Sequence, residues 1–331
     1  MVTTLPAQWE QTHSRIGIER AGAIKAQLEV RGVLELDAKL QQWGVDTVLI
    51  GSYRRKTAIY PCKDVDIFVK LPKAPASATP EEVFSEVQRV LVAHFKGRAT
   101  EQRRSMKISG FDDGLTVDAV PAVPDGDIWK IPQTDSKPVG DRWIKDRWEP
   151  TNPEGLTQLT EDTQQSSATI AGQPSYLRTV RLIKQMRDAH IGRGEKPGGL
   201  YLELLTYWAF HGGATAESYA ELLVPVLDSI ASGLNSGVPV VDPAMNQPYH
   251  PAPTPAVLAN AAAVFGRLAA TARSALALND CEAAVAWRQM FGQNEKGGWC
   301  FPLQPGCTET GARVVPIANR DRGSNADRPF A

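Results

Sequence analysis

The sequence of 331 residues predicts an α+β protein with two lobes, a small mixed sheet with helices followed by an all-helical lobe. Amphipathic helical stretches alternate with short β-branched runs up to residue 123, and a continuous helical pattern covers residues 175–292. At about 150 residues per domain, the length also fits two domains. The expected units are a core with N-terminal helices over residues 1–150, a helical domain over residues 151–305, and a polar, flexible tail over residues 306–331.

Periodicity and end signals predict the elements of the first lobe. Thr79-Pro80 begins a helix with proline at its first position, Gly44 ends another helix, and Asp112-Asp113-Gly114 is typical of a hairpin turn. The expected helices cover residues 1–31, 34–43 and 81–95, and the expected strands cover residues 46–50, 65–71, 102–108 and 115–120.

The second lobe is predicted from long helical patterns that follow a polar connection. Residues 124–175 are rich in Pro, Gly and Asp, and we interpret them as a crossover between the lobes with strand-like pieces at residues 127–131 and 142–148. The expected helices cover residues 176–190, 200–210, 216–234, 254–278 and 280–292. The second of these helices is apolar nearly all round, so we expect it to be buried.

Composition excludes several classes of protein. Hydrophobic residues make up 42% of the chain, which is enough to offset the ordering entropy of folding, so disorder over most of the chain is excluded. The 36 Lys and Arg residues against 37 Asp and Glu residues leave a net charge of −1, whereas proteins that bind duplex nucleic acid carry a clear basic excess. No stable nucleic-acid partner is therefore expected.

Membrane and secreted proteins are also disfavoured. The least polar stretch, residues 257–278, is interrupted by charged and polar side chains, and the N-terminal residues lack the apolar run of a signal peptide. The four cysteines are too few and too scattered for a disulfide framework or a zinc site; they are Cys62, Cys281, Cys300 and Cys307. We therefore expect free thiols in a cytoplasmic protein that has no membrane partner.

The stretch over residues 50–69 carries the strongest chemical signal. A β-run ends in Gly51-Ser52, a turn that lets the backbone and a serine hydroxyl approach an anion. Asp64 and Asp66 follow after eleven residues, and the strand period of two puts both carboxylates on one face. Two carboxylates on one face repel each other unless a cation lies between them, and carboxylate oxygens are ligands for Mg²⁺.

Asp118 is the third candidate acid, because it is the one charged residue in the β-run of residues 115–120. If this strand lies beside the strand of Asp64 and Asp66, three carboxylates converge and form a ligand set for two metal ions. Alone, a Gly-Ser pair is typical of a turn, and an Asp-x-Asp pair is typical of a solvated strand face. The ordered combination favours metal-dependent phosphoryl chemistry instead.

This combination resembles the active-site motif of DNA polymerase β-like nucleotidyltransferases, and specifically that of the bacterial CD-NTases, the cGAS/DncV-like nucleotidyltransferases. Trp148–Pro153 is similar to the segment that leads into the helical lobe of these enzymes, Tyr176–Arg187 to their "VRLLKxW" helix, and Ala284–Gly292 to their closing helix. The resemblance covers about residues 10–292. It implies a polymerase β-like nucleotidyltransferase lobe and an all-helical C-terminal lobe, with the active site in the cleft between them.

The resemblance also implies roles for the candidate residues. Asp64, Asp66 and Asp118 would be catalytic and bind Mg²⁺, with Mn²⁺ as a substitute, and Asp118 would help to take the proton from an attacking ribose hydroxyl. Gly51 and Ser52 would hold the donor triphosphate. The implied product is a cyclic di- or trinucleotide made from ATP or other NTPs with release of pyrophosphate. In family terms it is an alarm signal of CBASS anti-phage defence, which a downstream effector senses.

Lys184 is a further candidate for nucleotide binding. Its helical spacing with Arg181 and Gln185 is typical of a solvated helix face, whereas the resemblance implies contact between Lys184 and the triphosphate. Several relatives have a serine at the start of the following helix, where this chain has Leu200-Tyr201, so a phosphate contact from that position is not carried over.

Other basic and aromatic residues near the motif keep two interpretations open. The basic residues either neutralise phosphates or form solvated surface, and each aromatic residue either stacks on a base or packs in the core. These residues are Arg54, Arg55, Lys56, Arg103, Arg104, Lys107, Tyr53, Trp143 and Trp148.

The last residues, Arg328–Ala331, resemble the short tails of CD-NTases that are encoded beside a ubiquitin-transfer-like enzyme. The resemblance implies that an E1/E2-type partner joins the C-terminal carboxylate of Ala331 to another molecule. The alternative is a flexible chain end without such a role.

Three other functions use the same fold. An RNA-directed nucleotidyltransferase is disfavoured by the near-zero net charge, because an RNA substrate normally requires an electropositive surface. A nucleotidyltransferase that acts on a small molecule or a protein is disfavoured by the long helical region that resembles the CD-NTases. A non-catalytic nucleotide sensor usually lacks a metal ligand, and here all three acids are present.

Overall fold

The computed structural model describes residues 2–314 except 19–20, 135–137 and 141. The order of its main elements begins with α1 (Pro6–Ile16), α2 (Ala21–Glu35), α3 (Ala38–Gln42), β1 (Asp46–Ile50), α4 (Gly51–Arg54), β2 (Asp64–Lys70), α5 (Pro80–Phe95), β3 (Ala99–Glu101), β4 (Met106–Ile108), β5 (Thr116–Asp125), β6 (Ile128–Gln133) and β7 (Arg147–Thr151). The helices α6 (Pro153–Ser166), α7 (Tyr176–His190), α8 (Gly199–His211), α9 (Tyr219–Asn235), α10 (Pro255–Ala275) and α11 (Asp280–Phe291) follow. The α+β class predicted from the sequence is confirmed.

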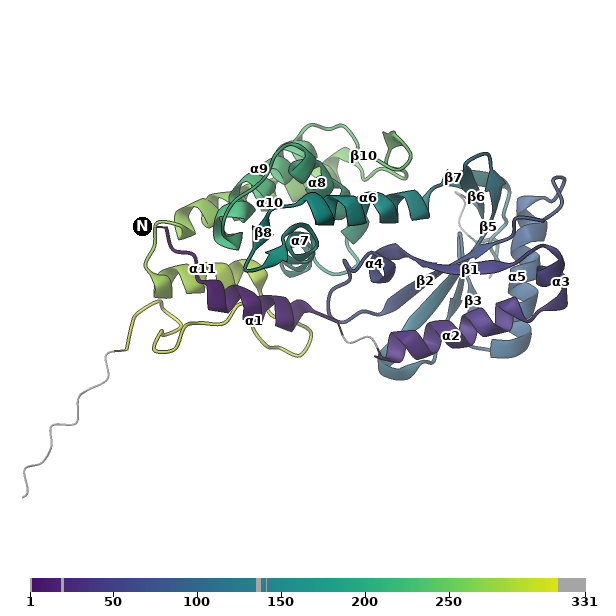
Figure 1. The fold of residues 1–331 in the computed structure, drawn as a ribbon, viewed down its shortest axis with the longest axis horizontal. Helices are drawn as coiled ribbons and strands as arrows, with labels where there is room; N and C mark the ends of the chain where they lie inside the picture. Colours follow the sequence, from purple (N-terminus) through teal and green to yellow (C-terminus); the bar gives the residue numbers. More distant parts are fainter. Residues whose placement is uncertain (1, 19–20, 135–137, 141, 315–331) are drawn as a thin grey trace, which may run out of the picture.

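A mixed sheet forms the first lobe, which occupies the right half of Figure 1. Its strands are ordered β1-β2-β5-β4-β3, and β6 pairs with both β5 and β7. The pair β2–β5 is parallel and the other pairs are antiparallel. Helices α2 and α5 cover one face of the sheet and bury apolar residues such as Val65, Ile67, Val117 and Ala119 against it. The opposite face carries Asp64, Asp66 and Asp118 together with a smaller apolar cluster around Phe68.

Helices α7 to α11 form a second core in the left half of Figure 1. Helix α8 is buried along most of its length, as its apolar pattern predicts. Helix α10 is long and apolar enough to cross a membrane by length and composition, but nine of its side chains are buried in the helical core, where it contacts α9 and α11.

The N-terminal helical stretch differs from the expectation. The single helix expected over residues 1–31 is two helices, and α1 packs with the helical lobe instead of the sheet lobe. Trp9 is buried among Trp287, Phe291 and Phe301, with ring centroids 5.0–5.6 Å apart. Helical periodicity identifies a buried face but not the lobe that buries it, which explains the error.

Most local signals are confirmed with small shifts of boundary, including β1 over Asp46–Ile50 and the start of α5 at Thr79-Pro80, where the structure adds a capping box between Thr79 and Glu82. The helix expected over residues 34–43 is shortened to α3, because α2 runs on to Glu35. Residues 124–175 are not a simple crossover. They contain the end of β5, the strands β6 and β7, and the helix α6, which begins at Pro153 after the Asn152 cap.

Two cysteines correct the expectation of free thiols. Cys281 at the start of α11 forms a disulfide with Cys307, and their Cα atoms lie 5.3 Å apart. Among the described residues, Cys62 and Cys300 form no disulfide. The bond ties the C-terminal segment to α11, so residues 306–314 of the expected flexible tail have a defined structure. The expected conjugation residue, Ala331, lies outside the described residues.

Candidate active site

The three candidate acids lie on two neighbouring parallel strands. Asp66 on β2 is paired in register with Asp118 on β5, and Asp64 is paired with Thr116. The residues that flank Asp66 on β2 and Asp118 on β5 are buried toward α2 and α5, so the acids project from the opposite face. The expectation that the two strands lie side by side is confirmed.

The acids form a local excess of negative charge. Burial raises the pKa of Asp66 to about 6, with the charge of Asp64 adding to the shift and Arg55 opposing it. Burial also raises the pKa of Asp118 to about 7, and there Asp66 and Asp64 add to the shift against Lys107. Oδ1 of Asp118 is buried and has no hydrogen-bond partner among the described residues.

The chemistry of these acids fits a divalent cation, but one of them, Asp64, has to change its partner before all three can bind the same ion. Hard oxygen donors and an unpartnered buried carboxylate oxygen are what Mg²⁺ requires. In the part of the chain that the structure describes, however, no three His, Cys, Asp or Glu side chains are gathered closely enough to hold a metal ion together. Asp64 Oδ1 instead accepts a hydrogen bond from Thr116 Oγ1 at 2.7 Å and lies 3.6 Å from Lys107 Nζ. Three-acid ligation therefore requires Asp64 to leave Lys107.

The Gly-Ser turn lies directly against Asp66. The turn follows β1, and Gly51 adopts a φ of +70°, a left-handed conformation that glycine tolerates best. A Cβ atom at this position would clash with Oδ2 of Asp66. The residue type at position 51 is therefore dictated both by the backbone conformation and by the close approach of a carboxylate.

A cavity of about 830 Å³ opens between the lobes at this turn. Gly51, Ser52, Asp64 and Asp66 line it from the sheet lobe, and Lys184 lines it from the helical lobe. Its volume is within the range of about 300–1,000 Å³ that is usual for ligand pockets. The predicted nucleotide-binding residues and two of the three acids thus share one cavity, and Asp118 lies next to it beside Asp66.

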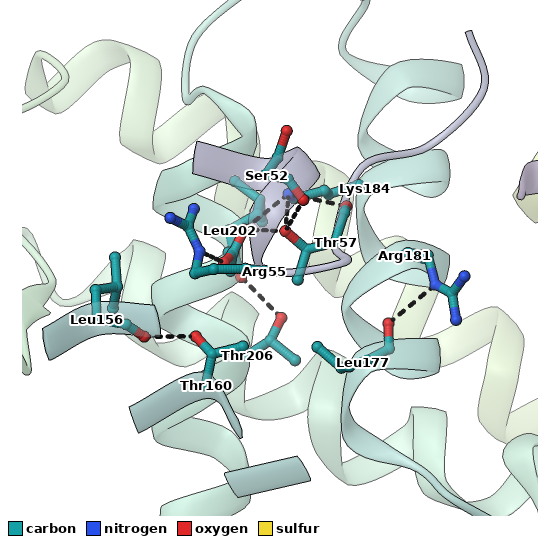
Figure 2. A network of polar contacts seen from close by, with 11 residues as sticks. Ser52, Arg55, Thr57, Leu156, Thr160, Leu177, Arg181, Lys184, Leu202 and Thr206 are labelled. Carbon is teal, nitrogen blue, oxygen red and sulfur yellow. Dashed lines mark hydrogen bonds and ion pairs between the residues drawn. The ribbon is translucent and has the colours of Figure 1, made fainter. Parts of the chain in front are cut away.

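Lys184 is buried, which corrects the solvated helix face that its spacing predicts. Its Nζ donates hydrogen bonds to the carbonyl oxygen and Oγ1 of Thr57, both at 3.1 Å, and to Oε2 of Glu203 at 2.7 Å. Figure 2 shows Arg55 and Thr57 close to Lys184, with Ser52 beside them. Burial lowers the pKa of Lys184, and the charge of Glu203 opposes this shift.

Glu203 is the residue that the sequence analysis missed. Its carboxylate accepts hydrogen bonds from Arg55 Nε at 2.6 Å and from Thr57 Oγ1 at 2.9 Å. Burial alone would raise the pKa of Glu203, but Arg55 and Lys184 lower it to about 2. One available signal was a lone acid in the apolar stretch of residues 200–210.

The remaining candidates separate into different environments. Lys107 is paired in register with Asp118, so it faces the acids. Arg104 forms an ion pair with Glu149 at 2.7 Å. Tyr53 is buried in the sheet core, which favours packing over base stacking for that residue.

Comparisons with known proteins agree with this geometry. Residues 8–163 match the model of the family described as Second Messenger Oligonucleotide or Dinucleotide Synthetase domain. Over 288 residues the chain is 26% identical to the cyclic AMP-AMP-AMP synthase of an Acinetobacter species, a match that covers 80% of this chain and 76% of that protein.

Solved structures show the same fold. The Bradyrhizobium diazoefficiens CD-NTase CdnG, in complex with GTP, superposes with a TM-score of 0.67 at 16% identity and covers 86% of this chain and 95% of its own. CdnC from E. coli MS115-1, solved with ATP, gives a TM-score of 0.64 at 15% identity and covers 90% of this chain and 98% of its own.

The sheet lobe has a polymerase β-like fold and carries paired carboxylates beside a Gly-Ser turn, and a helical lobe closes the cavity. This arrangement is that of a nucleotidyltransferase. Residues 8–163 match the Second Messenger Oligonucleotide or Dinucleotide Synthetase domain, and the chain shares the fold of the solved bacterial CD-NTases CdnG and CdnC.

Proposed function

We propose that this chain makes a cyclic di- or trinucleotide second messenger, with ATP among its substrates, in a Mg²⁺-dependent reaction that serves antiviral (CBASS) defence in the bacterial cytoplasm. The observation that carries the proposal is the pairing of Asp66 with Asp118 next to the Gly51 turn, at a cavity large enough for a nucleotide. The cyclic AMP-AMP-AMP synthase of Acinetobacter and the complex of CdnC with ATP support ATP as a substrate.

Each predicted site residue has a role in this proposal. Asp64, Asp66 and Asp118 would hold Mg²⁺, which when bound neutralises phosphate charge and makes a ribose hydroxyl easier to deprotonate. Asp118, with its unpartnered Oδ1, accepts the hydroxyl proton. The ribose oxygen forms a bond to the α-phosphorus while the bond from that phosphorus to the bridging oxygen breaks, and pyrophosphate leaves.

The phosphate-binding groups come from both lobes. Gly51 and Ser52 bind the donor triphosphate from the sheet lobe, and Lys184 reaches it from the helical lobe. The ammonium of Lys184 has three N–H donors, and in this structure it makes two hydrogen bonds to Thr57 and one to Glu203. Contact with the triphosphate therefore requires Lys184 to exchange one of these hydrogen bonds for one to phosphate.

The direct test is the reaction with labelled ATP, GTP, CTP and UTP in the presence of Mg²⁺ or Mn²⁺. We expect a small product that resists phosphatase. Asp66→Ala is expected to lower turnover by more than about a hundredfold, because even outer-shell partners of a metal cost 10–100-fold when removed. Asp118→Asn is expected to keep nucleotide binding better than chemistry. Asp125→Asn, on the same strand but exposed at its end, is the control and should retain wild-type turnover.

The outcomes separate the alternatives. A requirement for added RNA would support an RNA-directed enzyme, and labelling of a protein or small molecule would support transfer to that acceptor. Binding of NTPs without any product would support a sensor. Substantial turnover by Asp66→Ala would contradict the assignment of the metal ligands.

Two partner classes follow from the proposal. The cyclic product acts on a downstream effector, and a ubiquitin-transfer-like E1/E2 enzyme acts on the carboxylate of Ala331. No membrane and no stable nucleic-acid partner are expected, since the net charge is −1.

A further inference from the structure

Glu203 connects the two lobes at the floor of the cavity. It lies on α8 of the helical lobe, where its side chain is 2% exposed, and one of the groups it binds, Lys184, comes from α7. The other two, Arg55 and Thr57, belong to the segment that follows the Gly-Ser turn. A single buried carboxylate thus receives donors from both sides of the cleft.

The charges in this cluster do not cancel. Arg55 and Lys184 are both buried, and Glu203 is the anion that both contact. Removal of the carboxylate leaves two buried cations without their shared partner, which is strongly unfavourable. With the carboxylate present, the three side chains Arg55, Lys184 and Glu203 together carry one net positive charge, and the further acids that act on them are Asp66, which faces Arg55, and Asp188, which acts on Lys184.

The same cluster fixes the backbone of the turn. The amide N–H groups of Thr57 and Ala58 donate to the carbonyl oxygen of Ser52 at 2.9 and 3.1 Å, and the amide of Arg55 donates to the carbonyl oxygen of Gly51 at 3.1 Å. Because Glu203 binds the side chains of Arg55 and Thr57, it holds the segment that shapes the turn.

We propose that Glu203 is a positioning residue for nucleotidyl transfer, which acts through Lys184, Arg55 and Thr57 to hold the Gly-Ser turn and the Lys184 ammonium where they meet the triphosphate. This inference rests on the proposed function, because it takes the triphosphate of an NTP as the ligand. It assigns to α8 a residue that contributes to substrate affinity without contacting the substrate.

The test is to measure KM and kcat of Glu203→Gln separately and to compare each with the wild-type value. The turn and Lys184 hold the triphosphate in the ground state and the transition state alike, so their displacement should raise KM by about tenfold to a hundredfold and leave kcat within about threefold. A purely structural role lowers the folded fraction, which lowers apparent kcat and leaves KM unchanged. Glu221→Gln is the matched control: it removes a carboxylate from α9 that bonds to Ser218, and KM should stay at the wild-type value.

Two results would overturn the proposal. An unchanged KM in folded Glu203→Gln would show that the carboxylate does not position the phosphate-binding groups. A lowered KM would show that Glu203 competes with phosphate for Lys184.

A second variant and a second measurement keep the test decisive. If Glu203→Gln does not fold, Glu203→Asp keeps the counter-charge but is one methylene too short to reach all three donors, and it should raise KM less than tenfold but measurably. Calorimetric binding of a non-hydrolysable ATP analogue to each variant gives an affinity that needs no turnover. If the wild-type protein makes no cyclic product, the proposed function is rejected. If the ATP analogue also binds more weakly to Glu203→Gln than to the wild type, the positioning role is supported all the same, so the two failures are distinguishable.

Discussion

At the scale of single residues, a backbone turn lies directly against a carboxylate in the site. Gly51 leaves no side chain between the turn and Asp66, and its positive φ directs the chain from β1 into α4. A donor triphosphate held by the turn is thereby brought next to the acids that would hold the cation.

We expect Gly51→Ala to lower turnover by about a hundredfold, because displacement of reacting groups by about 1 Å can cost that much. The methyl group forces either Asp66 or the turn to move. Gly126→Ala is the matched control, since Gly126 has a φ of +65° but open space around it, so it carries the backbone strain without the clash. Steady-state kinetics on both variants provide the measurement. Equal losses would show that backbone strain, not contact with Asp66, determines the residue at position 51.

At the scale of elements, α1 has an unexpected partner. It precedes the sheet lobe in sequence, but it completes the core of the helical lobe, so the chain begins in one lobe and passes through the other before it returns. His13 on this helix is buried against Tyr219, with ring centroids 4.6 Å apart, and both of its ring nitrogens lack a hydrogen-bond partner among the described residues.

The packing of α1 should make stability depend on pH. Burial, with the charges of Arg178 and Arg181, lowers the pKa of His13 from 6.5 to about 3. Between these values the unfolded chain binds the proton on His13 more readily, so the contribution of His13 to the free energy of unfolding falls as pH falls below 6.5, by up to about 1.4 kcal/mol for each pH unit. Asp66 and Asp118, whose pKa values are raised to about 6 and about 7 in the folded state, contribute in the opposite direction. Urea unfolding at about pH 7.5 and about pH 5.5 measures this slope.

Two variants identify the group responsible. His13→Leu should remove the contribution of His13, so that the free energy of unfolding of the variant, relative to that of the wild type, rises as pH falls from about 7.5 to about 5.5. His94→Leu, which replaces an exposed histidine on α5, should retain the wild-type slope. A wild-type slope in His13→Leu would exclude His13 as its source.

At the scale of the whole molecule, the active-site cavity and the C-terminal segment are separate. The cavity is lined by residues between Ile50 and Asp242. The C-terminal segment is fastened to α11 by the Cys281–Cys307 disulfide, so the last described residues are anchored on the helical lobe.

Deletion of Phe330 and Ala331 should abolish conjugates in cells that carry the E1/E2-type partner and leave turnover to the cyclic product unchanged, because the described residues that line the cavity all lie between Ile50 and Asp242. Immunoblotting of the tagged chain measures conjugates, and the NTP assay measures turnover. Conjugates that persist after the deletion would reject Ala331 as the attachment point.

The sequence by itself determined the features that depend on near neighbours. The alternation of Asp64 and Asp66 with apolar residues set the strand face, the Thr79-Pro80 pair set the start of α5, and the order of turn and acids indicated the chemistry. The pairing of the strand of Asp118 with that of Asp66 was a hypothesis that the register confirms.

Only the tertiary structure decided the features that join distant segments. The hydrogen bond between Arg55 and Glu203 links residues 148 positions apart, and the disulfide links cysteines 26 positions apart. Helical spacing places Lys184 on a polar face of its helix. Whether that face contacts water or a buried carboxylate depends on which helix packs against it. Local periodicity records that a side chain is polar or apolar, whereas its partner is fixed by the arrangement of the lobes.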